Sequence, residues 1–101
     1  MRLRLLLLPA LMAPWFVQAQ TQDALYTRSL AATCANCHGT DGRAAAGSTM
    51  PALAGMSRDQ LVTQLKAFRD GSRPSTIMGQ LAKGYSDAQI EQLAGYFAAR
   101  K

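Results

Sequence analysis

The stretch Cys34-Ala35-Asn36-Cys37-His38 decides how the rest of this 101-residue chain is interpreted. Two residues separate its cysteines, and the chain's single histidine directly follows the second one. At the end of a helix, this spacing lets two thiols add to the vinyl groups on one edge of a porphyrin and places the imidazole beneath the iron. The pattern therefore predicts one covalently attached haem c, held by Cys34 and Cys37 with His38 as an axial iron ligand.

Three other uses of this motif compete with haem attachment. A thioredoxin-type redox pair is expected after a strand in a βαβ unit, and no strand pattern precedes Cys34. A zinc site needs a third and a fourth ligand, for which the chain has no further cysteine or histidine. A structural disulfide between Cys34 and Cys37 remains possible, but it leaves the position of His38 unexplained.

Residues 1–19 have the pattern of a cleaved secretory signal peptide. Arg2 and Arg4 precede an apolar stretch from Leu5 to Val17, and Val17 and Ala19 are the small residues expected before a cleavage site. The apolar stretch is too short for the roughly 20 residues of a membrane-spanning helix. We therefore expect a periplasmic protein with one domain over residues 20–101 and no membrane span after cleavage.

The composition is that of a small globular domain with a modest positive charge. The net charge is +5 and falls by two, to +3, when Arg2 and Arg4 leave with the signal. Basic residues form no run, which argues against nucleic-acid binding and is compatible with an acidic protein partner.

Three helices are predicted around the motif, and no segment alternates as a strand. The first is capped by Thr21 or Asp23 and runs toward Cys34. The second and third each open with a capping-box pattern, and Gly71 ends the second. The apolar residues at helical spacing are Leu25, Tyr26, Leu30 and Ala31 in the first helix, Leu61, Leu65 and Phe68 in the second, and Ile90, Leu93, Ala94 and Phe97 in the third, where Ser86-Asp87-Ala88-Gln89 is the box.

These helices predict an all-α fold in which three main helices surround the haem. A chain of this size seldom builds a sufficient apolar core without a cross-link or cofactor, and the haem supplies it. Gly95 interrupts the third helix, which suggests that another helix approaches closely there.

The iron needs a sixth ligand, and no second histidine exists. Outside the predicted signal, the thioether candidates are Met50, Met56 and Met78. Met50 directly precedes Pro51, close behind His38, and Met56 lies near the cap of the second helix, so we expect both to fill core space. Met78 lies in a stretch predicted to be irregular between the last two helices, where a loop crosses the other haem face. Met78 is the favoured ligand.

The order of helix, haem motif, proline loop, helix, methionine loop and helix resembles the class I cytochrome c family over nearly all of residues 20–101. The resemblance implies that the Pro51 carbonyl accepts a hydrogen bond from His38 and that Leu53 packs on the haem. It also implies that the first and last helices cross near Gly95, Tyr96 and Phe97.

Two further stretches, Gln64–Gly71 and Arg73–Met78, followed by Lys83-Gly84-Tyr85-Ser86-Asp87, are similar to one half of a cytochrome c4. They are also similar to the cytochrome subunit of flavocytochrome c sulfide dehydrogenase, in which a methionine at the position of Met78 is the distal ligand. This chain has one haem motif, unlike the two-haem members of either group.

The resemblance implies a periplasmic protein that transfers single electrons and catalyses nothing by itself. The favoured hypothesis is a haem subunit that accepts electrons from an FAD-containing, sulfide-oxidising flavoprotein. One alternative is a freely diffusing carrier that meets its redox partners through Lys66, Arg69, Arg73 and Lys83. A haem enzyme or gas sensor with an open iron site is the other alternative, and it requires that Met78 is not a ligand.

Overall fold

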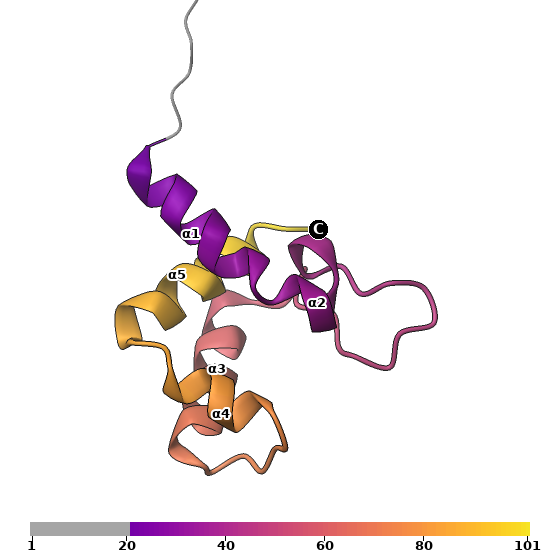
Figure 1. Ribbon diagram of the computed structural model, residues 1–101, viewed down its shortest axis with the longest axis vertical. Helices are drawn as coiled ribbons and strands as arrows, with labels where there is room; N and C mark the ends of the chain where they lie inside the picture. Colours follow the sequence, from indigo (N-terminus) through magenta and orange to yellow (C-terminus); the bar gives the residue numbers. More distant parts are fainter. Residues whose placement is uncertain (1–20) are drawn as a thin grey trace, which may run out of the picture.

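The computed structural model describes residues 21–101, which form an all-α fold (Figure 1). The predicted signal peptide, residues 1–19, lies outside the described residues. The described part contains five α-helices and one 3₁₀ turn and no strand, which confirms the predicted fold class. In chain order these are α1 (Gln22–Ala32), α2 (Ala35–His38), η1 (Thr40–Gly42), α3 (Arg58–Asp70), α4 (Met78–Lys83) and α5 (Asp87–Ala98).

The three long helices begin where the capping residues predict. Thr21, rather than Asp23, caps α1, and its side chain accepts the Ala24 N–H at 3.2 Å. Ser57 caps α3 by accepting the Gln60 N–H at 3.2 Å. The α5 box is complete, because the Ser86 hydroxyl and the Gln89 side chain each accept the other residue's N–H. These bonds satisfy donors that a helix start otherwise leaves unpaired.

The core is small and is built on α5. This helix packs against both α1 and α3, while α4 packs on α3 (Figure 1). All four apolar positions predicted for the α5 face are buried, and Ala31 of α1 and Leu61 of α3 pack against that face. The buried apolar side chains of the described part are Ala31, Leu61, Ala82, Ile90, Leu93, Ala94 and Phe97.

The segment around Met78 is helical, which corrects the prediction of an irregular loop. Met78 is the first residue of α4, and the Ser75 hydroxyl accepts the Gly79 N–H at 2.7 Å in the first turn of this helix. Ala82, at 0% exposure, fixes the short helix in the fold. The side chain of the N-cap residue, Ile77, makes no capping hydrogen bond, so the sequence lacks the signal that identified the other helix starts.

Two smaller expectations are also wrong. A β-carbon added to Gly95 would meet nothing within 4 Å, so no helix approaches this glycine closely. Met50 is 39% exposed and does not fill the core, whereas Met56 packs against the core cluster as expected. Both methionines lie in the loop between η1 and α3, but Met56 is two residues before α3, at the end of the loop that packs on the core.

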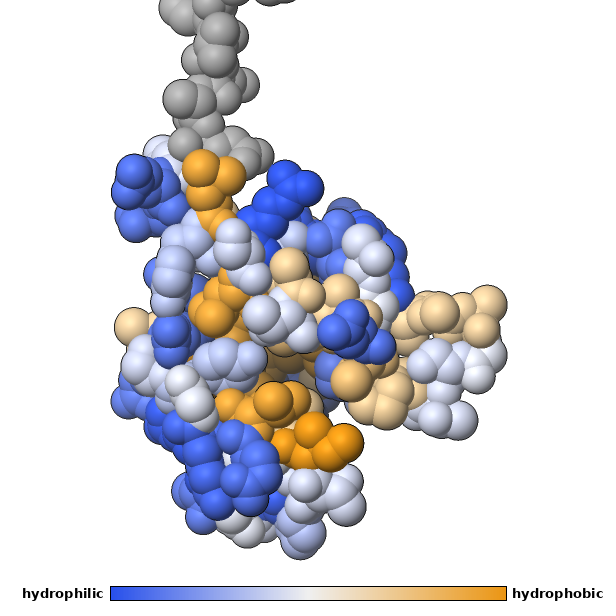
Figure 2. All heavy atoms as spheres, in the orientation of Figure 1, coloured by the Kyte–Doolittle hydropathy of each residue, from blue (hydrophilic) through white to orange (hydrophobic). Residues whose placement is uncertain are grey.

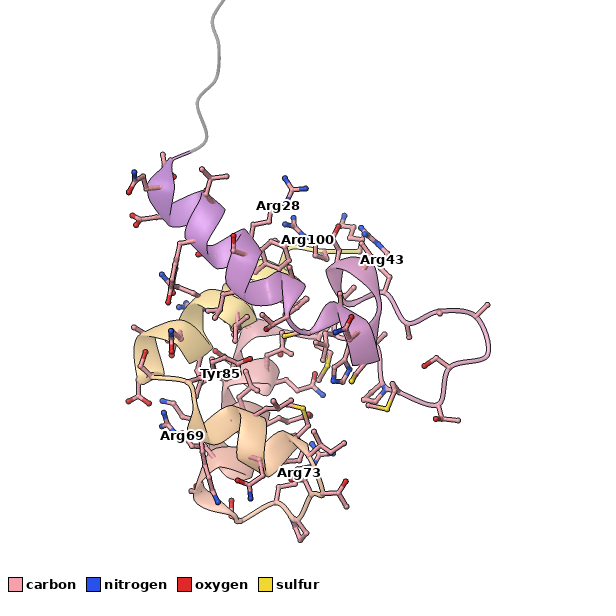
Figure 3. All side chains as sticks on the ribbon, viewed as in Figure 1. Arg28, Arg43, Arg69, Arg73, Tyr85 and Arg100 are labelled. Atoms are coloured by element: carbon pink, nitrogen blue, oxygen red, sulfur yellow. The ribbon has the colours of Figure 1, made fainter. Side chains whose placement is uncertain are left out.

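Arg69 links α3 to the start of α5, and Figure 3 shows it beside Tyr85. Its guanidinium donates to the Tyr85 carbonyl at 3.2 Å and to Asp87 Oδ1 at 2.5 Å. This hydrogen bond from Arg69 lowers the pKa of the Asp87 carboxyl. Arg69 is therefore engaged within the fold, and its charge is not free for a diffusing partner.

Gly42 tests the packing between α5 and the loop that follows α2. We predict that Gly42→Ala destabilises the protein by about 3 kcal/mol, because φ is +74° and the new β-carbon would lie 2.8 Å from Phe97 Cδ1 and 2.9 Å from Leu53 Cβ. The measurement is the free energy of unfolding in guanidinium chloride. Gly47→Ala is the matched control, with φ +77° but nothing within 4 Å, and we expect it to cost about 1 kcal/mol from backbone strain alone. Equal losses in the two variants would contradict the packing argument.

Candidate haem-attachment site

The motif residues lie together on one short helical turn. The chain leaves α1 at Thr33, and Cys34 is the N-cap of α2, whose last residue is His38. The His38 N–H donates to the Cys34 carbonyl at 2.9 Å, and Gly39, at φ +85°, ends the turn. This places both thiols and the imidazole on the same few residues of backbone, as the motif predicts.

Both thiols are free in the structure, with Cys34 half-buried and Cys37 exposed. Burial raises the pKa of the Cys34 thiol, which outweighs the opposite effect of its hydrogen bond with Thr33. The pair therefore consists of two separate thiols on one short turn, and Cys37 is the more exposed of the two.

His38 is buried, at 6% exposure, and its orientation is fixed by one hydrogen bond. Its Nδ1 lies 2.7 Å from the carbonyl oxygen of Pro51. A carbonyl oxygen only accepts hydrogen bonds, so Nδ1 carries the proton and Nε2 keeps a free lone pair. This tautomer is the one that binds a metal through Nε2 with a second partner orienting the ring.

The loop that carries Pro51 is tied to the turn after His38. The N–H groups of Leu53 and Ala54 both donate to the Gly42 carbonyl, at 2.8 and 3.1 Å. Leu53 is half-buried and packs against the core cluster. Two backbone hydrogen bonds therefore fix where the Pro51 carbonyl lies relative to the imidazole.

The structure brings together Cys34, Cys37, His38 and Pro51, with Leu53 in the adjoining loop. Met78 is not part of this cluster. It is half-buried at the first position of α4, on a separate element that packs on α3.

Sequence reasoning named Tyr96 only for a helix crossing and missed Asp41 and the contact that connects this site to α5. Tyr96 donates its hydroxyl hydrogen to Asp41 Oδ1 at 2.5 Å, and Asp41 adopts a left-handed conformation with φ +54°. This hydrogen bond is the largest cause of the lowered pKa of the Asp41 carboxyl. The signal available in the sequence was the pair Gly39 and Gly42 just after His38, which is typical of a tight turn with left-handed residues.

The residues present fit a covalently bound haem. The donor set consists of two unpaired thiols and a buried imidazole whose Nε2 is free, as a thioether-linked, histidine-ligated haem requires. Apolar side chains of the kind that cover a porphyrin are exposed at Met50 (39%), in the loop after the motif, and at Ile77 (61%) and Leu81 (49%), close in sequence to Met78. A groove of about 710 Å³ between α1 and α5 is lined by none of the predicted site residues, so it is not the haem site.

Similarity to known proteins agrees with this site. The cytochrome c family model matches residues 25–100. The cytochrome subunit of sulfide dehydrogenase from Chlorobaculum tepidum is 46% identical over 68 residues, which are 67% of this chain and 60% of that protein. Cytochrome c-554(548) from Halomonas halodenitrificans is 37% identical over 82 residues, which are 78% of this chain and 98% of that protein.

The solved structure of Acidithiobacillus ferrooxidans cytochrome c4 has the same fold, with a TM-score of 0.69 and 30% identity. The match covers 77% of this chain and 50% of the cytochrome c4 chain. The chain thus spans about half of that structure and 60% of the sulfide dehydrogenase subunit.

A family match over most of the chain, the helical fold and the single Cys34-x-x-Cys37-His38 turn all agree. The chain belongs to the cytochrome c family and carries one haem c.

Proposed function

We propose that this chain is the haem subunit that accepts electrons from a sulfide-oxidising flavoprotein in the bacterial periplasm. The observation that carries the proposal is the 46% identity to a cytochrome subunit of sulfide dehydrogenase. The signal pattern of residues 1–19 supports the periplasmic location. In residues 21–101, no helix is long and apolar enough to cross a membrane.

In this proposal Cys34 and Cys37 would hold the haem through thioether bonds, and His38 Nε2 and the Met78 sulfur would bind its iron. The haem supplies one-electron storage between its ferric and ferrous states when bound. Pro51 orients the imidazole, Leu53 packs on the ring, and a methionine opposite histidine favours the ferrous state. With both axial positions filled by side chains, the substrate of the partner never binds the metal.

The surface beside Met78 is apolar, and part of the positive charge proposed for a diffusing carrier is engaged within the fold. Ile77 directly precedes Met78 in the sequence, and Leu81 follows it by three residues. Their exposed fractions are 61% and 49%. Figure 2 shows hydrophobic side chains gathered on the visible face in the region of α4. Of the cations proposed for a diffusing carrier, Arg69 is paired with Asp87, and the Arg73 guanidinium lies 4.7 Å from the Phe68 ring centroid. Because two of the four proposed cations are engaged within the fold, a held partner is favoured over a brief electrostatic encounter.

A freely diffusing carrier is the second candidate. The similarity to cytochrome c-554(548) supports this candidate, because the match covers 98% of that protein's length. The two candidates differ in whether a flavoprotein remains bound during purification.

The thiols are tested by replacing both. We predict that Cys34→Ala with Cys37→Ala abolishes covalent haem and leaves the chain largely unfolded, because few apolar side chains are fully buried without the cofactor. The measurements are haem staining under denaturing conditions and circular dichroism. A folded, helical and haem-free double variant would contradict this view of the core.

The sixth ligand is tested by two methionine variants. Met78→Ala is expected to open the iron to carbon monoxide and to lower the reduction potential, because the thioether that stabilises ferrous iron is lost. Met56→Ala is the control, since Met56 packs against the core, and we expect neither change. Carbon monoxide difference spectra and potentiometric titration distinguish the two variants, and reversed outcomes would assign the ligand to Met56. If the unaltered protein bound carbon monoxide at once, an enzyme or sensor with an open iron site would be favoured instead.

The partner is tested by absorption spectroscopy of the protein purified natively from the periplasm, before and after sulfide is added. We expect flavin absorbance beside the c-type bands and reduction of the haem by sulfide. The chain separated from everything that copurifies is the control for direct reduction by sulfide, and we expect it to be reduced more slowly. A haem-only preparation indifferent to sulfide would support the free carrier.

A further inference from the structure

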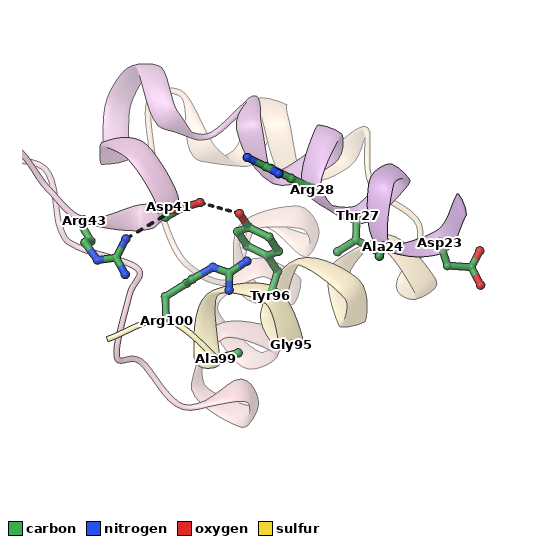
Figure 4. A pocket seen from close by; sticks show the side chains of 10 residues that line it. All are labelled: Asp23, Ala24, Thr27, Arg28, Asp41, Arg43, Gly95, Tyr96, Ala99 and Arg100. Atoms are coloured by element: carbon green, nitrogen blue, oxygen red, sulfur yellow. Dashed lines mark hydrogen bonds and ion pairs between the residues drawn. The ribbon is translucent and has the colours of Figure 1, made fainter. Parts of the chain in front are cut away.

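Tyr96 connects α5 to the turn that follows the haem motif, as Figure 4 shows. Its hydroxyl donates to Asp41 Oδ1 at 2.5 Å across 55 residues of sequence. The Arg100 guanidinium stacks over its ring at 3.9 Å from the centroid, and the Phe97 ring meets it edge to face at 5.3 Å. The Tyr96 side chain is thus held in place by contacts to both its ring and its hydroxyl.

Asp41 needs such an anchor, because it is the one described residue other than glycine with a positive φ, +54°. A left-handed conformation is strained for a residue with a β-carbon and persists only when neighbouring contacts hold it. Tyr96 supplies a hydrogen bond, and Arg43 supplies an ion pair at 3.5 Å. Because the hydrogen bond from Tyr96 lowers the pKa of Asp41, the carboxylate is the ionised acceptor near neutral pH.

Gly42, the residue after Asp41, connects this restrained turn to the loop that orients His38. The Gly42 carbonyl accepts the N–H groups of Leu53 and Ala54, and two residues before Leu53 the Pro51 carbonyl lies 2.7 Å from His38 Nδ1. The same end of α5 holds the far side of this loop, since the Gly55 N–H donates to the Arg100 carbonyl at 3.0 Å. The loop is therefore fixed at both ends by residues that α5 positions.

We propose that Tyr96 is a positioning residue that, through Asp41 and Gly42, holds the Pro51 carbonyl against His38 Nδ1 and so tunes the haem reduction potential. The inference rests on the proposed ligation of the iron by His38 and is independent of the electron donor. A firm hydrogen bond at Nδ1 makes the imidazole a stronger electron donor, which favours ferric iron. Loosening the loop therefore raises the reduction potential.

The test uses the haem-loaded full chain with Tyr96→Phe, which removes one hydroxyl and keeps the ring. We expect the His38 Nδ1–H of the ferrous protein to exchange with solvent several-fold faster by NMR, and the potential to rise in potentiometric titration. Tyr26→Phe is the matched control. The Tyr26 hydroxyl accepts a hydrogen bond from Gln89 Nε2 at 2.7 Å and so also links α1 to α5, but without contacting the loop. We expect Tyr26→Phe to change neither the exchange rate of His38 Nδ1–H nor the reduction potential.

Two Asp41 variants separate positioning from general stability. Asparagine and glycine both tolerate the left-handed backbone, but only asparagine keeps an oxygen for Tyr96. We expect Asp41→Asn to behave as the unaltered protein and Asp41→Gly to reproduce Tyr96→Phe. This pair decides the matter if Tyr96→Phe fails to take up haem.

The inference is overturned if Tyr96→Phe and Tyr26→Phe lower the unfolding temperature alike and leave exchange and potential unchanged. It is also overturned if Asp41→Gly and Asp41→Asn give the same exchange and potential. A failure of His38 ligation would look different, because the unaltered protein would then lack the haem-shifted His38 signals. A failure of the sulfide dehydrogenase proposal changes none of these measurements.

Discussion

The hydrogen bond between His38 Nδ1 and the Pro51 carbonyl oxygen is the contact on which the haem-attachment site depends. It joins two segments 13 residues apart and, at 2.7 Å, selects the tautomer that leaves Nε2 free. The motif alone places His38 on the turn with the thiols, but it does not orient the ring. Orientation comes from a loop outside the motif, so the geometry of the site is a property of the whole domain.

The helix α5 serves both the core and the site. Leu93, Ala94 and Phe97 pack in the core with residues of α1 and α3, and Ile90 of the same helix is also buried. Its C-terminal end contacts the loops on either side of the Pro51 carbonyl through Tyr96 and Arg100. Packing of the last helix and placement of the histidine are therefore coupled by direct contacts.

Local sequence signals predict much of this architecture. The capping residues Thr21, Ser57 and Ser86 locate the three long helices, because each satisfies donors within its own helix start. The Pro51 contact was expected from the family resemblance. The helix at Met78 was not, because its N-cap residue, Ile77, makes no side-chain capping bond and the helix is held by packing between α4 and α3.

Two further features also depend on contacts between distant segments rather than on local sequence signals. Gly95 was expected to allow close contact between helices, but only the three-dimensional path of α1 determines that the space above it is open. The Tyr96–Asp41 hydrogen bond spans 55 residues, and nothing in either residue's neighbours indicates its partner. Contacts between distant segments follow from the assembled fold and not from local spacing.

The small core makes the folded state depend on the bound cofactor. A reversibly bound cofactor stabilises a fold by a free energy that rises with the logarithm of its free concentration, so dilution weakens the folded state. Haem c is held by covalent bonds, and its contribution does not depend on free haem in the surroundings. A domain with so few fully buried side chains can therefore keep its structure in a dilute compartment for as long as the chain lasts.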